Sequence, residues 1–141
     1  GDTAHAYIHM PAEAEGYHYG TVTATNYSAV TAACLMCRKE VYEAAGGMDE
    51  QLAIEYNDTD LCLKFYDKQG LYNVYLPDVV LYHHESVSRG HPLRNKAAWK
   101  QHTRELGIMR QRYGGMFDND PFYNPNLNEE TVDGSMNGIQ Y

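Results

Sequence analysis

The chain has 141 residues, which is enough for one hydrophobic core and too few for two ordinary domains. Its net charge of -8 argues against binding to a nucleic-acid backbone, because phosphates are bound by a concentrated Lys/Arg surface. The three cysteines, an odd number, predict reduced thiols in a cytoplasmic chain and no disulfide scaffold. No apolar run approaches the roughly 18 residues of a membrane-spanning helix, so no transmembrane segment is expected.

The first third of the chain is predicted to contain a loop, a strand and a short helix. Residues 1–25 are small, polar and aromatic without a sustained period, which indicates irregular loop. Residues 30–37 are rich in β-branched and small apolar side chains, which is typical of a buried strand. Residues 38–47 have apolar side chains at helical spacing and close with Gly46 and Gly47, either of which can take the left-handed conformation that ends a helix.

A second helix with clear ends is predicted from residue 57 onward. Asn57 or Asp58 is the expected N-cap, Leu61 and Phe65 form the apolar face, and Gly70 lies just past the last turn. These three signals agree on the same helix and on its length.

Two short strands are predicted next, over residues 71–77 and 78–85. Both are rich in β-branched and aromatic residues. Pro77 lies between them and has no backbone N–H to donate to a ladder, so it marks a junction or a sheet edge.

The longest helical pattern runs from residue 94 to about 113. We expect Trp99 in its core and its basic residues on a solvated face, with Gly114 and Gly115 ending the helix. Residues 116–141 are rich in turn signals and are expected to form an extended tail.

Together these elements predict one mixed α/β domain over residues 1–141. The sequence has no glycine-rich turn that leads from a strand into a helix around a nucleotide phosphate. A self-sufficient dinucleotide site is therefore not expected in this chain.

Three polar residues stand at the start of the second predicted helix: Asn57, Asp58 and Asp60. Capping alone explains one of them, since a side-chain oxygen there accepts from the exposed first-turn amides. Asp58 and Asp60 are two positions apart and project in different directions, so we do not expect them to share a proton. A carboxylate fixed at a helix start can also act as a lone general base toward a bound hydroxyl. The local pattern leaves both roles open.

His83 and His84 end the second predicted strand. Neighbouring strand residues face opposite sides, so one imidazole can point into a cleft and bind a metal ion. A buried histidine beside an exposed one would explain the pair equally well. Cys34 and Cys37 could join them as zinc ligands by type, but two sulfurs three positions apart in a strand face opposite sides, which disfavours that site.

Arg89 lies among hydroxyl side chains in the segment HHESVSRG. One guanidinium beside serine hydroxyls and a glycine could bind an oxygen anion. An ordinary exposed loop would have the same composition.

The chain closely resembles the C-terminal half of bacterial family 2 glycosyltransferases. Three segments carry the likeness, in this order: NYSAVTAACLMCRKEVYEAAGGMDE, YNDTDLCLKFYDKQGLYNVYLPDVVLYHHESVSRG and NDPFYNPNL. The likeness covers roughly residues 16–127. Members of this family are GT-A fold enzymes, among them rhamnosyltransferase-like proteins of cell-envelope polysaccharide synthesis. The resemblance implies a partial GT-A fold, with a mixed sheet and flanking helices, from which the nucleotide-binding half is missing.

The resemblance also assigns roles to single residues. Asp58 matches the aspartate that deprotonates the acceptor hydroxyl in an inverting displacement, and Asn57 replaces the glutamate that usually precedes it. His83 matches a ligand of the divalent ion, Mn²⁺ or Mg²⁺, that holds the sugar-nucleotide diphosphate. The remaining substrate-binding candidates are Asp49, Glu50 and Asp60 on the acceptor side, Asn57 at the position of the usual glutamate, and Arg89 as the contact for an oxygen anion. Asp58 and His83 are then expected to open into one common hollow.

The partners implied by the resemblance are a nucleotide-sugar donor and a saccharide or lipid-linked acceptor. The expected location is the cytoplasm, with the inner face of the plasma membrane as an alternative. Because the nucleotide-binding half is expected elsewhere, we predict that this chain is inactive alone and that its uncovered apolar surface favours self-association. A non-catalytic carbohydrate-binding or protein-interaction module on the same scaffold is the alternative function.

Overall fold

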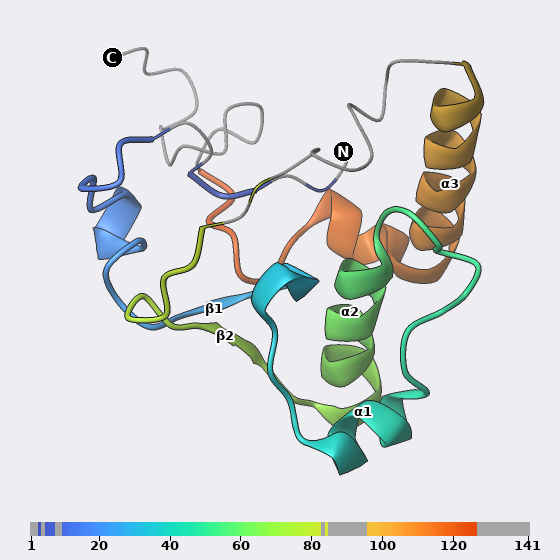
Figure 1. Ribbon diagram of the computed structural model, residues 1–141, viewed down its shortest axis with the longest axis horizontal. Helices are drawn as coiled ribbons and strands as arrows, with labels where there is room; N and C mark the ends of the chain where they lie inside the picture. Colours follow the sequence, from blue (N-terminus) through green and yellow to red (C-terminus); the bar gives the residue numbers. More distant parts are fainter. Residues whose placement is uncertain (1–2, 4, 8–9, 83, 85–95, 127–141) are drawn as a thin grey trace.

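The computed structural model describes residues 3, 5–7, 10–82, 84 and 96–126 (Figure 1). Within these residues the chain is a small mixed α/β structure, with three α-helices and one two-stranded antiparallel sheet. No helix of this part of the chain is both long and apolar enough to cross a membrane. Residues 10–24 are mostly irregular, as predicted, and contain one 3-10 turn, η1 (Tyr17–Tyr19).

The sheet consists of β1 (Thr25–Tyr27) and β2 (Asn73–Tyr75). Asn26 lies opposite Val74 in the antiparallel register. The first of the two strands predicted around Pro77 is therefore confirmed. The second is wrong for described residues 78–82 and 84, which form no strand, and the apolar side chains of residues 79–82 are exposed.

The strand predicted over residues 30–37 is also wrong. The chain instead forms a 3-10 turn, η2 (Ala32–Cys34). Its amides are used locally and by a distant carboxylate: Ala33 N donates to Thr31 Oγ1 at 3.3 Å, and Ala32 N donates to Asp58 Oδ2 at 3.0 Å. Since these donors are taken, they are not available for a ladder.

The two predicted shorter helices are confirmed as α1 (Lys39–Ala45) and α2 (Asn57–Gln69). Each is followed by a glycine in the left-handed region, Gly46 with φ 86° and Gly70 with φ 64°. The predicted N-cap is wrong. Both Asn57 and Asp58 lie inside α2, and the residue before the helix is Tyr56, which makes no side-chain capping hydrogen bond.

Helix α2 lies between two small hydrophobic clusters. On one side Leu61 and Phe65 pack against Ala45 of α1. On the other side Leu63 packs with Leu52 and Tyr56 of the loop before α2 and with Met109 of the last helix. We call this group the Leu52 cluster. Because both sides of α2 are covered, its first turn is fixed in relation to the loop before it and to the last helix.

The last helix, α3 (Lys96–Asp118), is kinked at Tyr113, where φ is -129°. Beyond the kink it turns toward the start of α2 (Figure 1). The predicted end at Gly114 and Gly115 is wrong, because the helix continues into residues expected in the tail. Each glycine costs roughly 1 kcal/mol in a helix, and the packing of Met116 and Phe117 on the Leu52 cluster offsets that cost.

The prediction that Trp99 lies in the core is wrong, because its side chain is 55% exposed. Glu105 and Met109, both with no exposed surface, occupy the side of α3 that faces the body. After α3, the segment up to residue 126 lies on the body. Its Phe122 ring packs against Tyr66 and Tyr72, each with ring centroids 5.6 Å away.

Candidate functional site

The first turn of α2 carries Asp58, the predicted general base. Its two carboxylate oxygens accept from backbone amides: Oδ1 from Thr59 N at 2.8 Å and Oδ2 from Ala32 N at 3.0 Å. The side chain is neither fully buried nor fully exposed. Asp58 therefore joins η2 to α2 and remains partly open to solvent.

Asp60 follows Asp58 by two residues in α2 and has no exposed surface. Its Oδ1 accepts from Arg112 Nη1 at 3.0 Å and from Tyr113 Oη at 2.9 Å. Lys64 Nζ lies 2.6 Å from Oδ2, at an angle that does not make a hydrogen bond, so this contact is an ion pair of the i, i+4 type. Burial and the neighbouring Asp60 carboxylate raise the pKa of Tyr113.

Asp49 lies in the loop between α1 and α2 and shares Arg112 with Asp60. Arg112 Nη2 donates to Asp49 Oδ2 at 2.6 Å, and Gln51 N donates to Asp49 Oδ1 at 2.8 Å. The Gln51 amide and then the Arg112 guanidinium hold the pKa of Asp49 below its usual value. Burial lowers the pKa of Arg112, but its bonds to the two carboxylates outweigh burial and raise that pKa. We call Asp49, Asp60, Lys64, Arg112 and Tyr113 the Arg112 cluster.

A second set of contacts ties the middle of the same loop to α3. Glu105 has no exposed surface, and its carboxylate accepts from Glu55 N at 2.8 Å and from Gln101 Nε2 at 2.9 Å. The side chain of Glu55 pairs with His102 Nδ1. Arg104 Nη1 adds a bond to the backbone oxygen of residue 51 at 3.2 Å. Helix α3 thus holds this loop at several points.

The sequence reasoning missed the roles of Glu105 and Arg112. Arg112 was included in a basic, solvated helix face, and Glu105 was given no role. A signal was available in their spacing, because Glu105, Met109 and Arg112 follow at i, i+4 and i+7 and so lie on the same side of a helix. A charged residue on a core-facing stripe needs a partner across the interface.

The other predicted site residues are placed as follows. Glu50 is exposed, Asn57 is partly buried in α2, and Asp49 and Asp60 are brought together by Arg112. His83 and Arg89 lie outside the described residues, so the common hollow of Asp58 and His83 stays a prediction. Among the described residues, no group of three or more His, Cys, Asp or Glu side chains is arranged to hold a metal ion.

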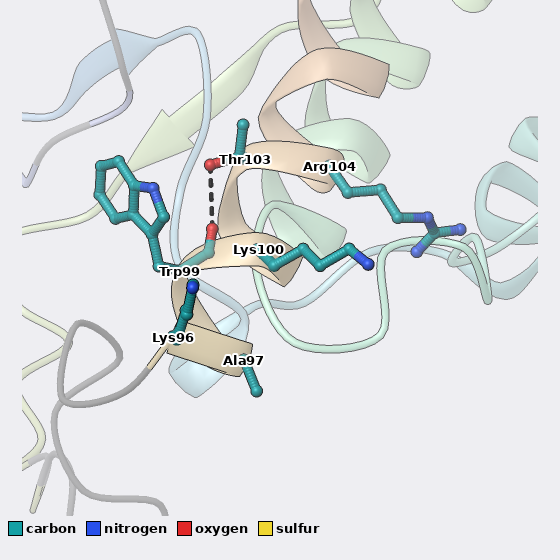
Figure 2. Close-up of a pocket in the computed structure, with 6 residues that line it drawn as sticks. All are labelled: Lys96, Ala97, Trp99, Lys100, Thr103 and Arg104. Atoms are coloured by element: carbon teal, nitrogen blue, oxygen red, sulfur yellow. Dashed lines mark hydrogen bonds between the residues drawn. The ribbon is translucent and has the colours of Figure 1, made fainter.

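The surface of α3 near its start has a shallow hollow around Trp99 (Figure 2). Three basic and three uncharged residues line it: Lys96, Ala97, Trp99, Lys100, Thr103 and Arg104. Figure 2 shows the Trp99 indole on one side of the helix and the Lys100 and Arg104 side chains on the other. Because these groups diverge, they do not surround a common ligand volume.

The chain is similar to parts of two larger proteins. It is 42% identical over 135 residues to the uncharacterized protein y4gI of Sinorhizobium fredii (strain NBRC 101917 / NGR234). It is 30% identical over 135 residues to the O-antigen biosynthesis protein RfbC of Myxococcus xanthus. Each comparison covers 94% of this chain, but the chain spans only 14% of the first relative and 10% of the second. No family model and no solved structure matches the chain.

Proposed function

We propose that this chain is the acceptor-side part of an inverting family 2 glycosyltransferase of the GT-A fold, which works in cell-envelope polysaccharide synthesis. The similarity to a protein named for O-antigen biosynthesis over 94% of the chain is the observation that carries the proposal. The mixed α/β arrangement and the ordered motifs agree with it. The activity requires a nucleotide-sugar donor and a saccharide or lipid-linked acceptor, in the cytoplasm or at the inner face of the plasma membrane.

Asp58 is the general base of the proposed reaction. Its carboxylate takes the proton from the acceptor hydroxyl, the acceptor oxygen bonds to the anomeric carbon, and the bond from that carbon to the diphosphate breaks. A carboxylate has about four acceptor positions, and two backbone amides use two of them at Asp58. The remaining positions can accept a substrate hydroxyl while the amides hold the group in place.

Further residues are proposed to contact the two substrates and a metal ion. Asp49, Glu50 and Asn57 are the candidates for the acceptor side, and Arg89 is the candidate for binding an oxygen anion. Asp60 is left out, because its side chain has no exposed surface. His83 is proposed as one ligand of a divalent ion, Mn²⁺ or Mg²⁺, the role that the resemblance assigns to it. When bound, such an ion supplies positive charge to the departing diphosphate.

The test is sugar transfer by the full-length gene product. Release of nucleoside diphosphate would be measured with a panel of nucleotide sugars and Mn²⁺ or Mg²⁺, for the wild type, Asp58→Asn and Asp67→Asn. Asp67 is an exposed carboxylate on the same helix and serves as the matched control. We expect Asp58→Asn to lose about 100-fold or more in turnover, since positioned acid–base catalysis contributes roughly that much.

Two results would contradict the proposal in different ways. Unchanged turnover in Asp58→Asn would remove the base assignment and leave the enzyme class standing. No turnover by the wild type with any donor and metal, together with binding of saccharides, would favour the non-catalytic module. The 141-residue chain assayed alone is expected to be inactive.

A further inference from the structure

We propose that Arg112 is a positioning residue for the reaction assigned to Asp58. This inference rests on the proposed function. By bridging Asp49 and Asp60, Arg112 fixes the direction in which α2 leaves the preceding loop, and so the direction in which the Asp58 carboxylate points. Arg112 itself touches neither the proposed base nor, in this proposal, the acceptor.

Arg112 joins the two ends of the segment from Asp49 to Asp60. One guanidinium nitrogen lies 2.6 Å from Asp49, at the start of the loop, and another lies 3.0 Å from Asp60, in the first turn of α2. A guanidinium has donors in a rigid planar fork, so two carboxylates held by it are fixed in distance and in angle. A lysine ammonium in the same place would keep the charge without the fork.

One residue between these two ends, Tyr56, has a strained backbone conformation that needs such restraint. Tyr56 has φ 60° and ψ 2°, the left-handed region that side chains with a Cβ disfavour, and it directly precedes α2. A strained residue of this kind persists only when its surroundings over-determine it. Here Glu105 holds the amide of the residue before Tyr56, and the Tyr56 side chain is 6% exposed in the Leu52 cluster.

The position of Asp58 depends on this restraint because it lies between Tyr56 and Asp60 in the chain. A change in the angle of the first turn of α2 moves the carboxylate away from the acceptor hydroxyl. Displacement of a reacting group by about 1 Å, caused by a mutation away from the chemistry, can reduce a rate roughly 100-fold. The effect falls mainly on kcat, since Arg112→Gln removes no side chain that is proposed to contact either substrate.

The kinetic test uses Arg112→Gln, Arg112→Lys and Lys100→Gln in the full-length gene product. Lys100 is an exposed cation on α3 outside the Arg112 cluster, so its variant controls for loss of one positive charge. We expect kcat to fall about 100-fold in Arg112→Gln and about 10-fold in Arg112→Lys. We expect KM for donor and acceptor to stay within about 2-fold, and the control to match the wild type. All variants are compared at a temperature where their far-UV circular dichroism equals that of the wild type.

A second measurement does not depend on activity. Amide hydrogen exchange of residues 50–60 is expected to be about 10-fold faster in Arg112→Gln than in Lys100→Gln, because the loop loses its restraint. Unchanged exchange in this segment overturns the inference whether or not transfer is detected. An unchanged kcat in folded Arg112→Gln also overturns it, and so does a raised acceptor KM at constant kcat, which would make Arg112 a binding residue. A wild type without turnover, or an active Asp58→Asn, is instead a failure of the proposed function.

Discussion

Asp60 is the group whose charge should matter most to the stability of this chain. Its carboxylate has no exposed surface and faces two cations, and removal of one partner of a buried ion pair typically costs roughly 3–5 kcal/mol. In Asp60→Asn two features reduce that figure. Arg112 is 29% exposed and keeps Asp49, and Lys64 keeps its bond to the backbone oxygen of Gly47 at 3.0 Å. The asparagine oxygen can still accept from Tyr113, and its size avoids a cavity. We therefore expect a loss of about 2 kcal/mol in the free energy of unfolding.

Urea unfolding of the purified chain, followed by circular dichroism, measures this loss. At roughly 4 °C per kcal/mol for a chain of this size, the thermal midpoint should fall by about 8 °C. Asp67→Asn removes an exposed carboxylate from the same helix and should change stability by less than about 0.5 kcal/mol. If Asp60→Asn unfolds at the same urea concentration and with the same slope as the wild type, the Arg112 cluster does not contribute to stability as the geometry implies.

Three further predictions concern other parts of the structure. Cys62 is fully buried, and burial raises the pKa of its thiol to about 11. Alkylation at pH 8 should therefore modify the exposed Cys34 and Cys37 and reach Cys62 only in urea, which mass spectrometry would show by the number of modified cysteines. The folded state holds the pKa of Asp49 below its unfolded value. The contribution of Asp49 to stability is therefore full above about pH 4 and is lost as pH falls through the folded pKa. Between pH 7 and pH 3, Asp49→Asn should lose less unfolding free energy than the wild type. Gly70→Ala meets no atom within 4 Å of the added Cβ, so it should cost only the left-handed strain, about 1 kcal/mol, in a urea titration, and a neutral result would contradict the role of that glycine.

The elements that the sequence predicted well are those whose signals are local. The end of α2 at Gly70 follows from one residue type and from the spacing of Leu61 and Phe65 before it. The strand over residues 30–37 failed because its composition does not tell where its amides bond. The acceptor for Ala32 N is the carboxylate of Asp58, which lies in another element.

The candidate site divides in the same way. The position of Asp58 at the start of a helix could be read from the motif around it, but its place inside the first turn, and not at the N-cap, could not. The partners of Arg112 could not, because Asp49 and Asp60 lie in other elements, and no local pattern distinguishes a solvated arginine from one that is shared by two carboxylates. The prediction that Trp99 is buried failed for the same reason, because only the packing of α3 decides which of its apolar residues face the body.

The small sheet has a consequence for the order of folding. Its two strands come from distant parts of the chain, whereas α1 and α2 are neighbours in sequence and pack on each other. Contacts between distant segments require closure of a long loop before any bond is gained, so they form late. Refolding should therefore produce helical signal first, and the edge-to-face contact of Tyr27 and Tyr75, whose ring centroids lie 6.1 Å apart, should form in the final phase.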